Sequence, residues 1–256
     1  MTEPAGIYPK VFIAGAPRSG TSILLFAMKD VFGLPGYGES HVIPAFSQMV
    51  HTLFTYMKEF EALDSSVLDE ILLKQVSLPN VREHLYQYIR EFYRRQFPEG
   101  GWVDKTPSPP GVFALAMAEK VFPDARLMVA QRNGIEVVSS YVKKFGSPFE
   151  SACEAWRSAM EGLTTIRPLC KNLLVVDQYD FFNATDRVAS DIAAHVGFPE
   201  KAERFASFLR TQRVESSSIH DWSGRLRLAD MPWPEQQKEL FRAKCGETME
   251  AAGYEI

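Results

Sequence analysis

The sequence predicts a three-layer α/β fold, with a central parallel sheet and helices on both of its faces. Three observations support this prediction. Short apolar runs that suit buried strands alternate with longer segments of helical periodicity. A glycine-containing turn joins the first of these runs directly to a helical segment. The chain has 256 residues, 46% of them hydrophobic, which is enough to bury the core that such a fold needs.

The first strand and helix are predicted over 10–15 and 21–31, on either side of a tight turn. Residues 33–38 contain three glycines and a proline and end this unit. From about 41 to 97 the periodicity is mostly helical, so we expect a helical insertion before the next strand.

One helix of this insertion has a recognisable start. Asn80 and Glu83 have the spacing of a capping box. The apolar residues that follow them recur at helical spacing and mark one face, formed by Val81, Leu85, Ile89 and Phe92.

The middle of the chain continues the alternation with a short strand predicted over 102–104. Ser108 can cap the next helix, because two prolines follow it in the first turn. A buried strand over 126–130 and helices over 134–145 and 149–167 come next.

The last third begins with a strand over 173–176 that ends at Asp177. Two helices are predicted within 186–210, and a final helix over 234–252. The polar stretch 211–233 between them has little periodicity, which indicates a long covering loop. We expect residues 1–256 to form a single domain.

Composition narrows the classes of function. The net charge of −4 argues against a general nucleic-acid-binding protein. The three cysteines are far apart, which suits reduced thiols in a cytoplasm better than a zinc site or a disulfide framework. We find no secretory signal and no apolar run of membrane-spanning length, so we expect a cytoplasmic protein without an integral membrane segment.

The turn after the first strand has the features of a phosphate-binding loop. Gly15 and Gly20 are separated by four residues, and the helix begins at once after them, so backbone N–H groups can surround an anion. Thr21-Ser22 stands where a nucleotide triphosphatase would have Lys-Ser or Lys-Thr, and Arg18 lies inside the loop. The loop therefore suits a phosphorylated donor other than a nucleoside triphosphate.

A second anion-binding element follows the strand over 126–130. Arg132 comes at its carboxyl end, where ligands of open α/β sheets bind, and Ser140 lies eight residues further on. Two turns of helix can bring the guanidinium and the hydroxyl onto one phosphate group.

These two elements resemble those of the sulfotransferases that use 3′-phosphoadenosine 5′-phosphosulfate (PAPS), in particular the branch with a Pro-Arg-Ser-Gly-Thr loop. The resemblance implies the P-loop-containing nucleoside-triphosphate-hydrolase-like fold. It also implies that Arg132 and Ser140 bind the 3′-phosphate, although Asn133-Gly134 replaces the usual Asp-Pro. The 5′-phosphosulfate would be bound by the loop residues Ala16, Pro17, Arg18, Ser19, Gly20, Thr21 and Ser22.

The same resemblance suggests the catalytic residues. Glu39, in a Gly-Glu…Ile-Pro stretch, falls at the catalytic carboxylate of the tyrosylprotein branch, and His41 is the alternative base used in other branches. Lys105, in a Lys-Thr-Pro stretch, would neutralise charge on the transferring group, with Arg18 as the second candidate cation.

The resemblance implies transfer of a sulfuryl group from PAPS to an acceptor hydroxyl, leaving adenosine 3′,5′-bisphosphate (PAP). We expect no metal requirement, and an acceptor that is a sugar or glycoconjugate, or else a small alcohol or phenol. The alternative is a P-loop kinase or other nucleotide-binding protein that uses ATP or GTP, with Asp177 as a magnesium ligand. The oligomeric state stays open.

Overall fold

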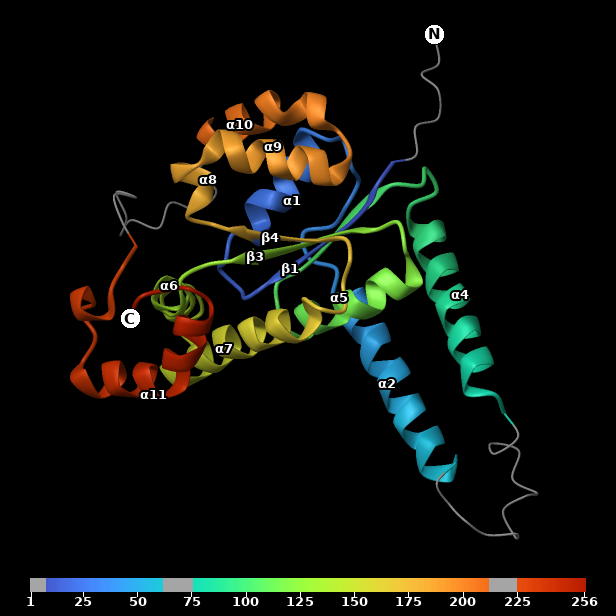
Figure 1. Cartoon of the computed structure of the whole chain (residues 1–256), viewed down its shortest axis with the longest axis horizontal. Helices are drawn as coiled ribbons and strands as arrows, with labels where there is room; N and C mark the ends of the chain where they lie inside the picture. The colour runs from blue at the N-terminus through green and yellow to red at the C-terminus, as the bar shows by residue number, and fades with distance from the viewer. Residues whose placement is uncertain (1–7, 62–75, 212–224) are drawn as a thin grey trace.

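The computed structural model describes residues 8–61, 76–211 and 225–256. It confirms the predicted architecture, because four parallel strands form one sheet in the order β2-β1-β3-β4 and helices flank it (Figure 1). The strands are β1 (Lys10–Gly15), β2 (Trp102–Thr106), β3 (Arg126–Gln131) and β4 (Leu173–Asp177). Three of them run one or two residues further than the sequence predicts. In β2 the additional residues are Lys105 and Thr106, so Lys105 lies on the strand itself.

Helices form a layer on each face of the sheet (Figure 1). One layer consists of α1 (Thr21–Asp30), α8 (Asp180–Asn183), α9 (Thr185–Val196) and α10 (Ala202–Thr211). The other consists of α5 (Pro109–Val121), α6 (Gly134–Phe145), α7 (Phe149–Ile166) and α11 (Glu235–Ala251). The insertion supplies α2 (Val42–Glu61) and α4 (Leu78–Gln96), which contact α5 and project beyond the sheet (Figure 1).

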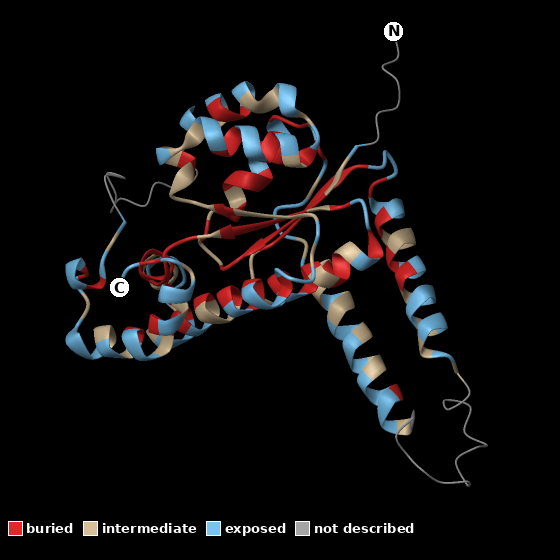
Figure 2. Ribbon diagram, viewed as in Figure 1, coloured by how far each residue is buried: buried red, intermediate tan, exposed pale blue. Residues whose placement is uncertain are grey.

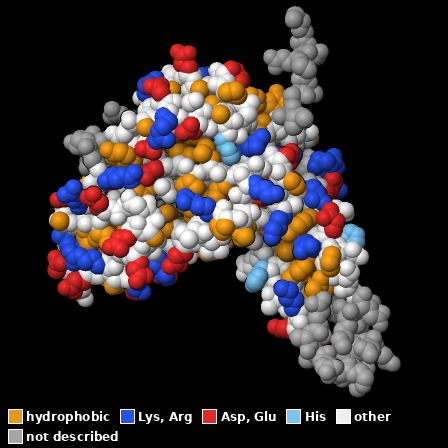
Figure 3. Space-filling model, in the orientation of Figure 1, with side chains coloured by type: hydrophobic (Ala, Val, Ile, Leu, Met, Phe, Trp, Pro, Cys, Tyr) orange, Lys and Arg blue, Asp and Glu red, His pale blue; other side chains and the backbone are white. Residues whose placement is uncertain are grey.

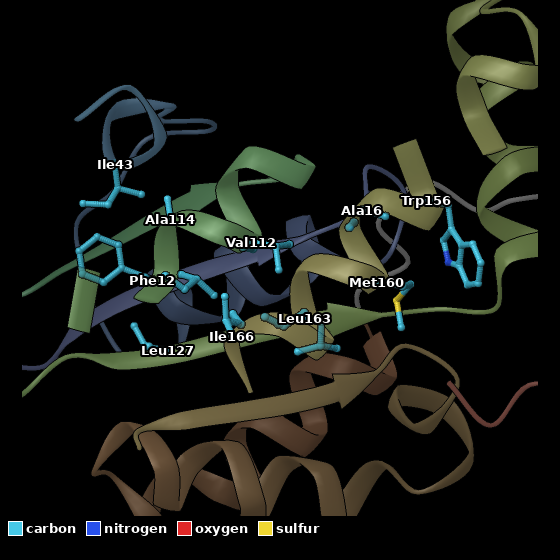
Figure 4. Packing of buried hydrophobic residues seen from close by; sticks show 14 of the residues in the cluster. Phe12, Ala16, Ile43, Val112, Ala114, Leu127, Trp156, Met160, Leu163 and Ile166 are labelled. Atoms are coloured by element: carbon cyan, nitrogen blue, oxygen red, sulfur yellow. The ribbon is translucent and has the colours of Figure 1, made fainter. Parts of the chain in front are cut away.

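The sheet is buried on both faces because its strands alternate two sets of apolar side chains. Phe12 and Ala14 of β1 point into the core under α5 and α7, whereas Val11 and Ile13 point into the core under α1 and α9. Figure 2 shows the buried residues concentrated in the sheet and along the helix faces that cover it. Figure 4 shows how Phe12 lies in the first core, to which α7 contributes Trp156 and Met160.

The helix boundaries agree with the sequence in part. Ser108 caps α5 as predicted, since its side chain accepts a hydrogen bond from the Gly111 N–H at 3.1 Å. The predicted capping box at Asn80 and Glu83 is wrong, because α4 begins at Leu78 with Ser77 at the N-cap position. Proline in the first turn fixes the helical φ there, and this starts the helix earlier than Asn80.

The last third of the chain contains short helices that the sequence did not predict. The short helix α8 was not predicted, and 3₁₀ helices lie at Pro199–Lys201 and Leu228–Asp230. Most of the predicted covering loop, residues 212–224, lies outside the described residues. Within the described residues, no helix has the length and apolar character needed to span a membrane.

The carboxyl ends of all four strands meet at one edge of the sheet. The strand order places β1 and β3 next to each other, and their connections leave in opposite directions, toward β2 and β4. The gap between two such strands is the usual ligand site of an open parallel sheet. Residues 35–41 run along the outer side of β2 toward the same edge, with Val103 N–H bonded to the Pro35 carbonyl at 2.8 Å.

Gly15 closes β1 at this edge and tolerates no side chain. Its φ is +154°, and an added Cβ would collide with the Ala130 carbonyl oxygen of β3. We expect Gly15→Ala to lower the free energy of unfolding by on the order of 4 kcal/mol, from backbone strain and overpacking together. Gly33→Ala is the control, since its φ of +76° carries strain but no atom lies within 4 Å of the added Cβ. It should cost about 1–2 kcal/mol. Urea unfolding measures both, and equal losses would contradict the close contact of β1 and β3.

Candidate active site

The buried polar side chains of the described residues lie at or near the carboxyl edge of the sheet. Eight such residues occur in the described part of the chain, and they all lie in β2 or follow β1 or β3. They are Ser19, Thr21, Asp104, Lys105, Thr106, Arg132, Asn133 and Glu136. Burying polar groups costs free energy unless they are hydrogen-bonded, so this concentration marks the functional edge.

The loop after β1 turns tightly and leads straight into α1. The Ser19 hydroxyl and N–H both donate to the Ala16 carbonyl, at 2.7 and 3.2 Å. Arg18 and Gly20 have φ angles of +74° and +98°. Helix α1 begins at Thr21, and its N-cap residue Gly20 has no side chain that could cap the first N–H groups. The positive end of this helix therefore faces the loop, as an anion site requires.

Arg18, Arg132 and Ser140 meet beside this loop. Arg132 donates from its NH1 group to the Arg18 carbonyl at 3.1 Å, and Arg18 Nε donates to Ser140 Oγ at 3.0 Å. The predicted 3′-phosphate pair, Arg132 and Ser140, is thus linked through Arg18. Asn133 caps α6 by accepting from the Ile135 N–H at 2.8 Å. Asn133-Gly134 therefore starts α6 with a side-chain cap, without the Asp-Pro expected from the resemblance.

Glu136 also belongs to this group, although the sequence did not predict it. Its Oε2 accepts a hydrogen bond from Arg132 Nε at 2.7 Å, and both side chains are buried. The carboxylate holds the guanidinium in one orientation, with its NH1 group toward the loop. The available signal was the short spacing of the two residues, since Glu136 lies in the first turn of α6 and Arg132 directly precedes the N-cap residue Asn133.

A second group joins Glu39, His41 and Lys105. Glu39 Oε1 accepts from Lys105 Nζ at 3.1 Å, and its other oxygen, Oε2, lies 2.9 Å from His41 Nε2. The Lys105 side chain is only 4% exposed, whereas that of Glu39 is 50% exposed. The cation is therefore buried, while the carboxylate stays within reach of a molecule in solution.

The ionisation of Glu39 follows from these contacts. Partial burial by itself would raise its pKa, but the hydrogen bonds from His41 and Lys105 and the charge of Lys105 outweigh this effect and lower the pKa. Glu39 is thus a carboxylate at neutral pH and can accept a proton.

His41 has a constrained backbone. Its φ of +54° lies in the left-handed region, which costs a residue with a side chain about 1–3 kcal/mol unless the surroundings impose it. The surroundings here include a hydrogen bond from the His41 N–H to Thr106 Oγ1 at 3.1 Å.

Asp177 ends β4 at the same edge but has structural partners. Arg225 forms an ion pair with its Oδ2 at 2.9 Å, and the Tyr254 hydroxyl donates to the same oxygen at 2.8 Å. The Arg225 guanidinium also lies over the rings of Tyr179 and Tyr254. Asp177 thus ties the last residues of the chain to β4. Across the described ranges, no three His, Cys, Asp or Glu side chains form a group that could hold a metal ion.

The chain is similar to known proteins over most of its length. The sequence model described as "Sulfotransferase family" matches residues 9–202. No curated protein has significant sequence similarity to the chain.

Several solved structures share its fold, among them the following three. The sulfotransferase domain from the Synechococcus PCC 7002 olefin synthase is 18% identical, with a TM-score of 0.60, and the match covers 97% of this chain and 95% of that one. Sulfotransferase STF9 from Mycobacterium avium is 14% identical, with a TM-score of 0.56 and coverage of 98% and 78%. The sulfotransferase domain from the curacin biosynthetic pathway is 16% identical, with a TM-score of 0.54 and coverage of 97% and 99%.

Proposed function

The chain belongs to the sulfotransferase family, and from this premise we propose that it transfers the sulfuryl group of PAPS to an acceptor hydroxyl. The observation that carries the proposal is the meeting of Glu39, His41 and Lys105 next to the phosphate loop. The sheet register pairs Ile13 with Lys105, so the cation lies on the strand beside β1, close to where the loop begins. A base, a cation and an anion site at one sheet edge are the parts that sulfuryl transfer needs.

The donor would lie across the gap between β1 and β3. We assign its 5′-phosphosulfate to the N–H groups of residues 16–22 and the start of α1. Arg132 and Ser140 would hold the 3′-phosphate, and Arg18 of the loop is hydrogen-bonded to both of them. Charge-assisted bonds from a guanidinium to a phosphate are strong and directional, so this group also suits recognition of the 3′ position.

Transfer would proceed by in-line displacement. The acceptor oxygen forms a bond to sulfur while Glu39 takes its proton, and the bond from sulfur to the bridging phosphate oxygen breaks with its electron pair on that oxygen. PAP leaves. Lys105 would stabilise the charge that develops on the bridging oxygen, and its burial makes this charge effective. His41 would orient Glu39 or take over as base.

We propose a sugar or glycoconjugate as the acceptor. Helix α2 starts at Val42, directly after His41, and carries several aromatic side chains that stay partly or largely exposed. They include Phe46, which packs edge-on against Tyr88, and Tyr56, which packs against Phe60. Figure 3 shows hydrophobic side chains on the projecting part of the molecule formed by α2 and α4. Exposed aromatic faces suit the apolar faces of sugar rings, and a small alcohol or phenol is the next candidate.

PAP should bind much more tightly than AMP or ATP, because Arg132 and Ser140 serve the 3′-phosphate. We expect Arg132→Ala to weaken PAP binding about tenfold or more, while AMP binding changes little, since a charge-assisted bond contributes about 1.5–3 kcal/mol. Isothermal titration calorimetry measures both affinities. The control is Arg187→Ala, which removes an exposed arginine paired with Asp180. Equal affinity of the wild-type protein for AMP and PAP would contradict the proposal, and preference for ATP would favour a kinase.

A further inference from the structure

The segment 39–41, which carries Glu39 and His41, is hydrogen-bonded to the end of β2. The Ser40 N–H donates to the Lys105 carbonyl at 3.0 Å, and the His41 N–H donates to Thr106 Oγ1 at 3.1 Å. A third bond runs from the Ser40 hydroxyl to Asp104 Oδ2 at 2.6 Å. The segment thus has a backbone link and two links to side chains of the strand.

Asp104 is the centre of the side-chain links. Its Oδ2 also accepts a hydrogen bond from the Tyr93 hydroxyl at 2.5 Å, and its Oδ1 accepts from Thr106 Oγ1 at 3.4 Å. Thr106 in turn accepts from the His41 N–H, so Asp104 reaches the segment by two routes, through Ser40 and through Thr106.

Asp104 is an unusual residue for its place in the fold. It is 3% exposed and follows the apolar Trp102 and Val103 in a strand. Burial raises the pKa of its carboxyl group, and the hydrogen bonds from Ser40, Tyr93 and Thr106 act against that rise. Burying a carboxyl group costs free energy even when hydrogen bonds offset part of the cost, so its presence at this position points to a role besides stability.

We propose that Asp104 is a positioning residue, which fixes the Glu39–His41 segment against β2 so that Glu39 and His41 meet Lys105. This inference rests on the proposed function for the roles of Glu39 and His41. The left-handed backbone of His41 supports it, because such a conformation persists where bonds on either side impose it. Ser40 supplies one of these bonds through Asp104, and Thr106 supplies another.

Three variants separate positioning from stability. Ser40→Ala removes the direct link and leaves Asp104 in place. Asp104→Asn keeps the size of the side chain but replaces the carboxylate, which accepts from the hydroxyls of Ser40 and Tyr93, with a neutral amide. Tyr93→Phe is the matched control, because Tyr93 donates to the same carboxylate oxygen as Ser40 but does not belong to the segment.

Two measurements follow. Hydrogen exchange at the Ser40 and His41 amides should accelerate about tenfold or more in Ser40→Ala and Asp104→Asn, and stay within about twofold of wild type in Tyr93→Phe. The turnover number kcat should fall about tenfold or more in the first two variants, with PAP affinity unchanged, because misplaced catalytic groups slow the reaction without weakening nucleotide binding. In a Glu39→Gln background, Ser40→Ala should lower kcat much less than it does in the wild-type protein. Both changes act through the Glu39 carboxylate, so their effects should not add.

Unchanged amide exchange in Ser40→Ala would overturn the inference, and so would equal effects of Tyr93→Phe and Ser40→Ala on kcat. If Asp104→Asn fails to fold, Ser40→Ala decides the question alone. A wild-type protein that transfers no sulfuryl group from PAPS contradicts the proposed function. In that case the exchange measurement still tests whether Asp104 fixes the segment.

Discussion

Glu39→Gln should reduce turnover roughly 10²–10⁴-fold, the usual cost of removing a general base. Glutamine keeps the size of the side chain and can still accept a hydrogen bond from Lys105, but it cannot take the acceptor's proton. PAP affinity should stay nearly unchanged, because Arg132 and Ser140 belong to the other group of the site. Steady-state kinetics with labelled PAPS, together with calorimetry for PAP, separates the two effects.

The same variant tests the choice between Glu39 and His41. If Glu39 is the base, the deficit of Glu39→Gln should shrink with more acidic acceptor hydroxyls, which need less help in losing a proton. In that case His41→Gln should cost less, since the contact of His41 with Glu39 at 2.9 Å would serve only to orient the carboxylate. Near wild-type turnover of Glu39→Gln would rule out its role as the base and make His41 the candidate.

Lys105→Ala should lower turnover roughly 10²–10³-fold, the cost usually seen when one preorganised group that stabilises developing charge is lost. The side chain is 4% exposed, so its charge acts in a dry site where water screens it little. If Lys105 acts on the leaving group, as proposed, the deficit of Lys105→Ala should not depend on acceptor acidity. This independence is the opposite of the result expected for Glu39→Gln.

The control for Lys105 is Lys244→Ala, which removes an exposed lysine paired with Glu150. It should leave turnover unchanged. A deficit of Lys105→Ala that varies with acceptor acidity would mean that Lys105 acts on Glu39, to which it donates at 3.1 Å, and not on the leaving group.

The sequence predicts the fold well because its signals are local. Apolar runs, a cap at Ser108 and glycines at 15 and 20 act within a few residues of where they occur, so strands, helices and the loop follow from them. The capping error at Asn80 has the same origin. Two local start signals compete there, and the proline in the first turn of α4 prevails.

The site is only partly predictable because its contacts join distant segments. Glu39 and Lys105 are 66 positions apart, and nothing local indicates that they meet. The resemblance to known motifs predicted both residues as part of the site. Only the folded structure shows that they form an ion pair. Asp104 was missed because its partners Ser40 and Tyr93 come from two other segments, 64 and 11 positions away. Its one local signal was a charged residue at the end of an otherwise apolar run.

The path of residues 35–41 along β2 has a consequence beyond catalysis. β2 is the outermost strand on its side of the sheet, and these residues occupy its open margin through Val103 and Lys105. An uncovered strand margin is a template for pairing with other chains, which leads to aggregation. The stretch that carries Glu39 and His41 therefore also covers a margin of β2 that would otherwise be open to such pairing. We thus expect variants that release this stretch from β2 to aggregate as well as to lose turnover, because the same few hydrogen bonds hold it in place.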